Sequence, residues 1–97
     1  MLKIEFTAPD VVALQGRLDA AQAVAAQTAL DGTQGVVTLD CHALEYIASA
    51  GLGVLLKTQK RLKGSGGKLR LTGLNRHVHD VFTYAGFDKL FEIERAA

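Results

Sequence analysis

The 97-residue sequence contains no tryptophan, one proline, one methionine and one cysteine. A single cysteine, Cys41, cannot form an internal disulfide, and such sparse use of cysteine is typical of a reducing compartment. No hydrophobic run approaches the roughly 20 residues that would span a bilayer. The N-terminus also lacks the apolar centre of a signal peptide. These absences predict a cytoplasmic protein with no membrane partner.

The sequence also lacks an excess of either charge, because its 11 basic residues nearly balance its 10 acidic ones. The longest basic cluster, Lys57 to Lys63, is predicted to lie on a solvated helix face. Nucleic-acid binders normally carry a basic stripe, so no nucleic-acid partner is expected. The hydrophobic residues, 48% of the chain, suffice for one core, which predicts a single domain over residues 1–97.

Motifs for catalysis are missing as well. The glycine-rich stretch 64–68 is not a phosphate-binding P-loop, because it precedes a predicted strand and Leu69 stands where the motif needs a hydroxyl. Ile47 replaces the first glycine of a G-x-S-x-G nucleophile elbow. His77 and His79 lie about 200° apart around a helix and cannot share a metal. We expect no catalytic residues, no metal and no cofactor.

Hydrophobic periodicity predicts the element order ββαβαβαβ. Residues 42–48 are interpreted as a connection that follows a strand buried on both faces. Strands alternating with helices imply parallel pairing through crossover connections. The expected strands cover 2–7, 11–18, 36–41, 68–74 and 90–94, and the expected helices cover 20–30, 49–63 and 76 to about 85.

Three polar residues are predicted to converge where the strands end. Asp19 follows the second strand as a helix N-cap, Asp40 ends the third strand, and Ser49 opens a helix. The carboxyl ends of parallel strands, with the helix N-termini that face them, are the usual binding edge of such a sheet. Ser49 is either an N-cap or a favourable place for a phosphate, since free amides and the helix dipole stabilise negative charge there.

Two glycines, Gly51 and Gly53, follow Ser49 within the same predicted helix. Each glycine costs roughly 0.5–1 kcal/mol there relative to alanine. We expect them to be small so that a partner can approach Ser49, with packing against a neighbouring strand as an equal alternative for Gly53. Gly51→Ala should then keep or raise thermal stability while weakening partner binding.

Three stretches of the chain resemble one known family. "LQGRLDA" (14–20), "VVTLDCHALEYIASAGLGVLL" (36–56) and "NRHVHDVFTYAGFDKLFEI" (75–93) are similar to anti-sigma factor antagonists, the single-domain bacterial members of the STAS (sulfate transporter and anti-sigma antagonist) class. The resemblance implies an α/β fold, a small mixed and mainly parallel sheet of about five strands with three or more helices mostly on one face. One departure is Ala48, where many members have aspartate or serine.

The resemblance also implies a function. Unphosphorylated members bind an anti-sigma factor that is a serine kinase of the histidine-kinase-like ATPase type, which frees a sigma factor. Phosphorylation of the signature serine, here Ser49, reverses this binding, and a serine phosphatase restores it. A monomer or weak dimer is expected. The implied partner-binding residues are Asp19, Asp40, Ala48, Ser49, Ala50, Gly51, Leu52 and Gly53.

Two alternatives remain at this point. The chain is alternatively a constitutive STAS binding subunit of a transporter or a larger signalling complex, without a phospho-switch and with Ser49 serving only as a cap. A small ligand-binding or nucleotide-binding domain that uses the same helix N-terminus is the third interpretation. A negative charge at residue 49 changes partner affinity only under the first interpretation.

Overall fold

The computed structural model describes residues 1–94. The predicted order ββαβαβαβ is confirmed, with one added 3-10 turn, η1, between the second strand and the first helix. The elements are β1 (Leu2–Ala8), β2 (Val11–Leu18), η1 (Ala20–Gln22), α1 (Ala23–Asp31), β3 (Val36–Ile47), α2 (Ser49–Gly64), β4 (Lys68–Thr72), α3 (Arg76–Tyr84) and β5 (Glu92–Glu94).

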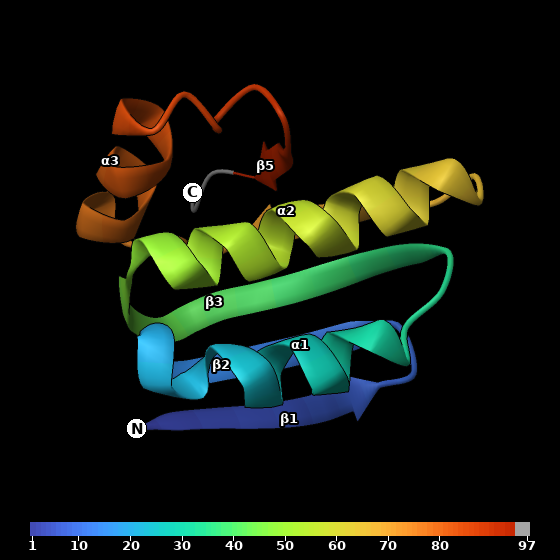
Figure 1. Ribbon diagram of the computed structural model, residues 1–97, viewed down its shortest axis with the longest axis horizontal. Coiled ribbons are helices and arrows are strands. Elements are labelled where there is room, and N and C mark those ends of the chain that lie inside the picture. Colours follow the sequence, from blue (N-terminus) through green and yellow to red (C-terminus); the bar gives the residue numbers. More distant parts are fainter. Residues whose placement is uncertain (95–97) are drawn as a thin grey trace.

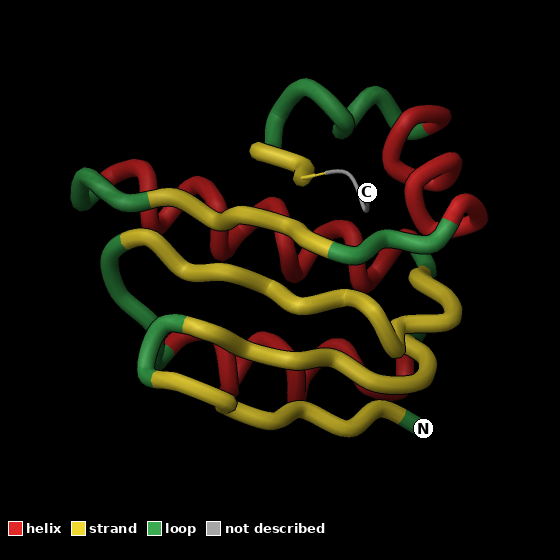
Figure 2. The backbone as a smooth tube through the Cα atoms, turned by 180° about the vertical axis from the view of Figure 1, so that it is seen from behind, coloured by secondary structure: helices red, strands yellow, loops and turns green. Residues whose placement is uncertain are grey.

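The strands form one five-stranded sheet in the order β1-β2-β3-β4-β5. β1 pairs antiparallel with β2, and the other neighbouring strands pair in parallel. Helices α1 and α2 lie side by side over one face of the sheet (Figure 1), while α3 lies at the end of the sheet where α2 begins. The opposite face carries no helix from the described residues 1–94 (Figure 2). The mixed, mainly parallel sheet with helices mostly on one face is therefore confirmed.

The hydrophobic core lies between the sheet and the helices. Alternate residues of the central strands, such as Leu39 and Leu71, point into it and are fully buried, as the period of a strand requires. Helix α2 contributes Leu55 and Leu62, which lie seven residues apart on one face of the helix. Phe82 from α3 closes the core at the end where α2 begins. Within residues 1–94, no helix combines the length and the apolar character needed to cross a membrane.

The third strand is twice as long as predicted. β3 continues to Ile47, so the interpretation of residues 42–48 as a connection was wrong. Pairing with β4 ends at Asp40 opposite Thr72, and the second half of β3 pairs only with β2. Two shifts in the β2–β3 register absorb extra residues there, as β-bulges do. The residues of this half are largely exposed, so their hydrophobic pattern does not indicate a strand.

Helices α2 and α3 begin at the predicted residues, whereas α1 begins at Ala23, after the 3-10 turn η1. The Asn75 side chain accepts a hydrogen bond from the Val78 amide at 2.8 Å, which is the predicted cap. Ala48, not Ser49, is the N-cap of α2, and Ser49 is the first helical residue. Asp19 precedes η1, and its carboxylate makes no cap hydrogen bond. Ser49 is therefore not the cap of α2, and Asp19 occupies the N-cap position of η1 without the predicted side-chain hydrogen bond.

Candidate functional site

Ser49 stands exposed at the start of a 16-residue helix. The chain is held there by its backbone, since the Ala48 amide donates to the Leu18 carbonyl at 3.0 Å. No residue among 1–94 forms a hydrogen bond with the Ser49 hydroxyl. The first-turn amides of a helix lack intrahelical partners and form its positive end. Ser49 thus offers an accessible hydroxyl in a setting that favours negative charge.

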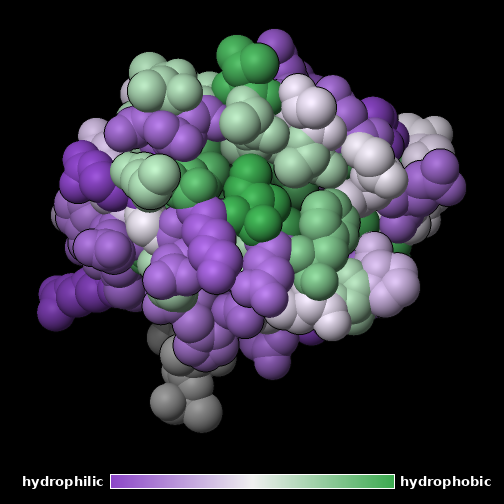
Figure 3. Space-filling model, turned by 90° about the horizontal axis from the view of Figure 1, so that it is seen from below, coloured by the Kyte–Doolittle hydropathy of each residue, from purple (hydrophilic) through white to green (hydrophobic). Residues whose placement is uncertain are grey.

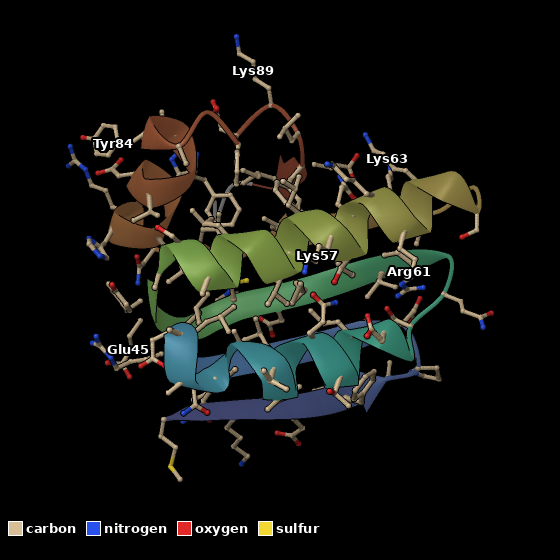
Figure 4. The ribbon with its side chains drawn as sticks, viewed as in Figure 1. Glu45, Lys57, Arg61, Lys63, Tyr84 and Lys89 are labelled. Carbon is tan, nitrogen blue, oxygen red and sulfur yellow. The ribbon has the colours of Figure 1, made fainter. Side chains whose placement is uncertain are left out.

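An open groove runs between α1 and α2 beside Ser49. Its volume is about 340 Å³, and Figure 4 shows Lys57 in the space between the two helices. Ala50 and Gly53 supply its α2 wall near Ser49. Val24 is 80% exposed on the α1 side. The α1 wall was not predicted from the sequence, although apolar Val24, out of phase with buried Ala26, was a signal for it. The groove is lined by Ala23, Val24, Gln27, Thr28, Ala50, Gly53, Val54 and Lys57.

The two glycines of α2 face opposite surroundings. A Cβ added to Gly51 would lie 2.8 Å from the Leu18 carbonyl oxygen and 2.9 Å from Ile47 Cγ1. Gly51 is therefore required for packing between α2 and the strand ends, and the expectation that it opens a path to Ser49 was wrong. A Cβ added to Gly53 would meet no atom within 4 Å, so its packing alternative was also wrong. Leu52, only 6% exposed, belongs to the core.

Asp19 lies at the same edge as Ser49. The hydrogen bond between the Leu18 carbonyl and the Ala48 amide joins the two segments, and Asp19 and Ser49 each follow a partner of this bond. Asp19 Oδ1 is buried and has no hydrogen-bond partner among the described residues. A buried polar atom without a partner costs roughly 1–3 kcal/mol. The structure thus brings Asp19 and Ser49 together, as the sequence predicted.

Asp40 lies elsewhere. It occupies the middle of β3, seven residues before Ile47, which at about 3.3 Å per residue amounts to roughly 20 Å of strand. Its side chain faces the helix-free side of the sheet, in a small hollow shared with Lys3, Gln15 and His42. The prediction that Asp40 lies beside Ser49 was wrong, because the strand does not end where its apolar run ends.

His42 is the partner of Asp40 on this helix-free face. Asp40 Oδ1 lies 2.5 Å from His42 Nδ1 and accepts the His42 amide at 3.1 Å. The side-chain and backbone hydrogen bonds from His42 lower the pKa of the Asp40 carboxyl, since they stabilise its charged form. This pair is local to β3 and is not part of the Ser49 edge.

A stacked cluster that the sequence analysis missed lies near the ends of β2 and β3. Arg17 Cζ is 4.3 Å from the centroid of the Tyr46 ring, a cation–π distance. The Tyr46 and His77 rings stack with centroids 6.1 Å apart. Arg17 pairs with Tyr46 in the β2–β3 register. The cluster joins residues that are far apart in sequence, so no local sequence pattern predicted it.

The single cysteine, Cys41, is buried in β3 and does not lie at the Ser49 edge. Burial raises the pKa of the Cys41 thiol to about 12, so the thiolate needed for nucleophilic attack is scarce. Within residues 1–94, no group of three or more His, Cys, Asp or Glu side chains could hold a metal ion. The edge around Ser49 combines an exposed hydroxyl with a concave surface, which suits docking of another protein.

Comparison with known proteins identifies the family. The model of the family described as "Mlab, STAS domain" matches residues 5–92. This chain belongs to the STAS domain family. BtrV of Bordetella bronchiseptica, which is named as a candidate anti-sigma factor antagonist, is 37% identical to this STAS domain over 87 residues. The match covers 86% of this chain and 75% of BtrV, which places the chain in the anti-sigma factor antagonist family.

Solved structures share the same fold. A candidate anti-sigma factor antagonist from Thermotoga maritima superposes with a TM-score of 0.78 at 23% identity, covering 99% of this chain and 86% of that one. SpoIIAA in its unphosphorylated form gives 0.71 at 16% identity, over 100% and 90%. The phosphorylated form of SpoIIAA from Bacillus gives 0.66 at 19% identity, over 100% and 92%. At these identities the likeness establishes the fold of this STAS domain.

Proposed function

We propose that this STAS domain is an anti-sigma factor antagonist switched by phosphorylation of Ser49. Its unphosphorylated form binds an anti-sigma factor that is also a serine kinase of the histidine-kinase-like ATPase type, and a sigma factor is thereby freed. The kinase transfers a phosphoryl group to Ser49 Oγ and then dissociates, and a serine phosphatase restores the binding form. The domain catalyses no step itself and acts in the cytoplasm.

One observation carries this proposal: Ser49 presents an exposed hydroxyl that no residue among 1–94 bonds, at the first residue of α2 and beside an open groove. A phosphate at this position is compatible with the fold, because the helix N-terminus stabilises negative charge. SpoIIAA, which shares the fold, has been solved in unphosphorylated and phosphorylated forms. That pair supports a fold that tolerates phosphorylation.

The same phosphate would oppose a docked partner. It adds about −1.5 to −2 charges to an edge that already carries Asp19. Glu45 is exposed at the same end of the molecule, near the start of α2 (Figure 4). A partner that covers Ser49 while it is uncharged must, after phosphorylation, bury a hydrated anion for which its surface has no matching charge, and this desolvation lowers the affinity. The proposed docking surface consists of Asp19, Ala48, Ser49, Ala50 and Gly53 together with the α1 wall of the groove.

Paired baits test the switch. Ser49→Ala and Ser49→Asp variants are used to capture partners from lysate of the source organism, with Ser65→Asp as the matched control. Ser65 is the only other serine of the chain and lies just after the opposite end of α2. An ATPase-type kinase held by Ser49→Ala and Ser65→Asp, and lost from Ser49→Asp, supports the proposal. Equal recovery of one partner by all three baits contradicts it and favours a constitutive binding subunit.

The acceptor residue is tested with the recovered kinase. The wild-type domain is incubated with this kinase and ATP, and its intact mass is measured. We expect the wild type and Ser65→Ala to gain one phosphoryl group and Ser49→Ala to gain none. Phosphorylation of Ser49→Ala at the same rate as the wild type would show that Ser49 is not the acceptor.

A further inference from the structure

The outer edge of β1 is unpaired in the described structure. β1 is a terminal strand of the sheet. The side of the molecule seen from below shows hydrophobic residues near its middle, between hydrophilic regions (Figure 3). Phe6 is 48% exposed. An open edge strand with apolar residues is a template for pairing with another strand.

The hydrogen bonds of β1 show which of its backbone groups are free. The Arg17 amide donates to the Met1 carbonyl at 3.0 Å, so Met1 and Arg17 form a hydrogen-bonded pair. Such pairs alternate along an antiparallel ladder. In the observed register, Lys3 and Glu5 therefore bond to β2, while the N–H and C=O groups of Leu2, Ile4 and Phe6 point away from the sheet.

We infer that the β1 edge binds a second copy of this chain, with Ile4 opposite Ile4 of the partner subunit. Homodimers are most often twofold symmetric, and such an interface is self-complementary. In this register Leu2 lies opposite Phe6 of the partner subunit, and Phe6 lies opposite the partner's Leu2. Every outward-facing backbone group of the three even-numbered residues then finds a partner. The two sheets become one continuous ten-stranded sheet.

Charge favours this register over the two adjacent ones on the β1 edge. A dimer axis at Lys3 would place lysine opposite lysine, and an axis at Glu5 would place glutamate opposite glutamate. An axis at Ile4 places Lys3 of each copy opposite Glu5 of the partner subunit, which gives two pairs of opposite charges. Neither Lys3 nor Glu5 has an ion-pair partner within residues 1–94, and side chains of non-hydrogen-bonded pairs lie close together.

The proposed interface is separate from the Ser49 edge. β1 is an outer strand of the sheet, and β2 separates it from β3, the strand that leads into α2. Self-association through β1 therefore leaves the groove and Ser49 free in both copies. It does not rest on the proposed function and can hold or fail independently of it.

Charge reversal tests the inference in the intact domain by sedimentation velocity over a wide range of concentrations. The wild type should associate reversibly to a dimer. Lys3→Glu and Glu5→Lys each place like charges opposite one another, and each should weaken the dimer at least tenfold. The double variant carrying both changes restores opposite charges and should associate as the wild type does.

Mixing the two single variants gives the sharper result. One carries glutamate at both positions and the other carries lysine at both, so the equimolar mixture should form a heterodimer although neither variant dimerises alone. Both residues are exposed, and unchanged circular dichroism and urea midpoints serve as the folding control. A wild type that stays monomeric, a dimer indifferent to single reversals, or a mixture that stays monomeric would each overturn the inference.

Discussion

Gly51 and Gly53 lie two residues apart in α2, on opposite sides of the helix. Gly51 is buried where α2 touches the ends of β2 and β3, with the Leu18 carbonyl oxygen in the space a Cβ would need. Gly53 borders the open groove and has free space around it. Both carry the same cost in helix propensity, so only their surroundings distinguish a glycine that lets elements pack from one that keeps a surface concave.

The largest expected effect comes from adding a methyl group on the packed side. Gly51→Ala should reduce the free energy of unfolding by about 1–3 kcal/mol, the usual range for overpacking, because one obstructing atom is backbone and cannot rotate away. Urea unfolding followed by circular dichroism measures this change. Unchanged stability would mean that α2 shifts without cost and that the contact with Leu18 is not tight.

A bulky side chain on the open side should affect binding instead. Ala50→Trp fills the end of the groove next to Ser49 and should weaken binding of the kinase partner tenfold or more, about 1.4 kcal/mol. Stability should change by no more than about 0.5 kcal/mol, as is usual for exposed positions. Isothermal titration calorimetry with the purified partner checks the affinity. Full affinity in Ala50→Trp would remove the groove from the docking surface.

The matched substitution at the second glycine should have a smaller effect of opposite sign. Gly53→Ala should raise the free energy of unfolding by about 0.5–1 kcal/mol, since alanine is the better helix former and meets no obstacle. The same urea experiment provides the measurement. A loss of stability similar to that of Gly51→Ala would abolish the contrast between the two sides of α2.

The smallest effect concerns the helix-free face of β3, where Asp40 faces outward and its neighbour Cys41 is buried. His42 lowers the pKa of Asp40, so this pair stabilises the fold above the ordinary pKa of 3.8. Its contribution is lost as the pH falls through the lower folded-state value. Both side chains are substantially exposed, so His42→Ala should cost less than about 0.5 kcal/mol at neutral pH.

The carboxyl pKa of Asp40 is the more sensitive measurement. An NMR titration should show this pKa rising toward its ordinary value in His42→Ala. His79→Ala on α3 serves as the control and should leave it unchanged. An Asp40 pKa that stays low in His42→Ala would assign the effect to another donor.

Periodicity was sufficient to predict the order of elements, whereas the placement of the helices mostly on one face followed from the family resemblance. Asn75 was recognisable as a cap because its side chain acts within its own turn. The end of β3 was not recognisable, because pairing with β2 alone leaves exposed residues that resemble a connection. That single error displaced Asp40 to the wrong place in the predicted site.

Contacts between distant segments account for the remaining errors. The need for Gly51 depends on Leu18, which is remote in sequence and meets it only after the sheet has formed. The stack of Arg17 on Tyr46 follows from a register containing two shifts. The cap interpretation of Ser49 failed because the backbone of Ala48, rather than a side chain, holds the start of α2.

The Ser49 hydroxyl has no hydrogen-bond partner within residues 1–94, and this bears on how fast an enzyme can act on it. A hydroxyl that caps a helix is available to an enzyme only during the fraction of time in which the end of the helix frays. The hydroxyl of Ser49 holds no part of α2 together, so an enzyme can act on it while the fold stays intact. Under the proposed switch, encounter with the kinase rather than fraying of α2 would then set the rate at which Ser49 is phosphorylated. Substitutions in the core could therefore alter how long the folded protein survives without altering how fast Ser49 would be modified. Evolution could then change these two properties separately.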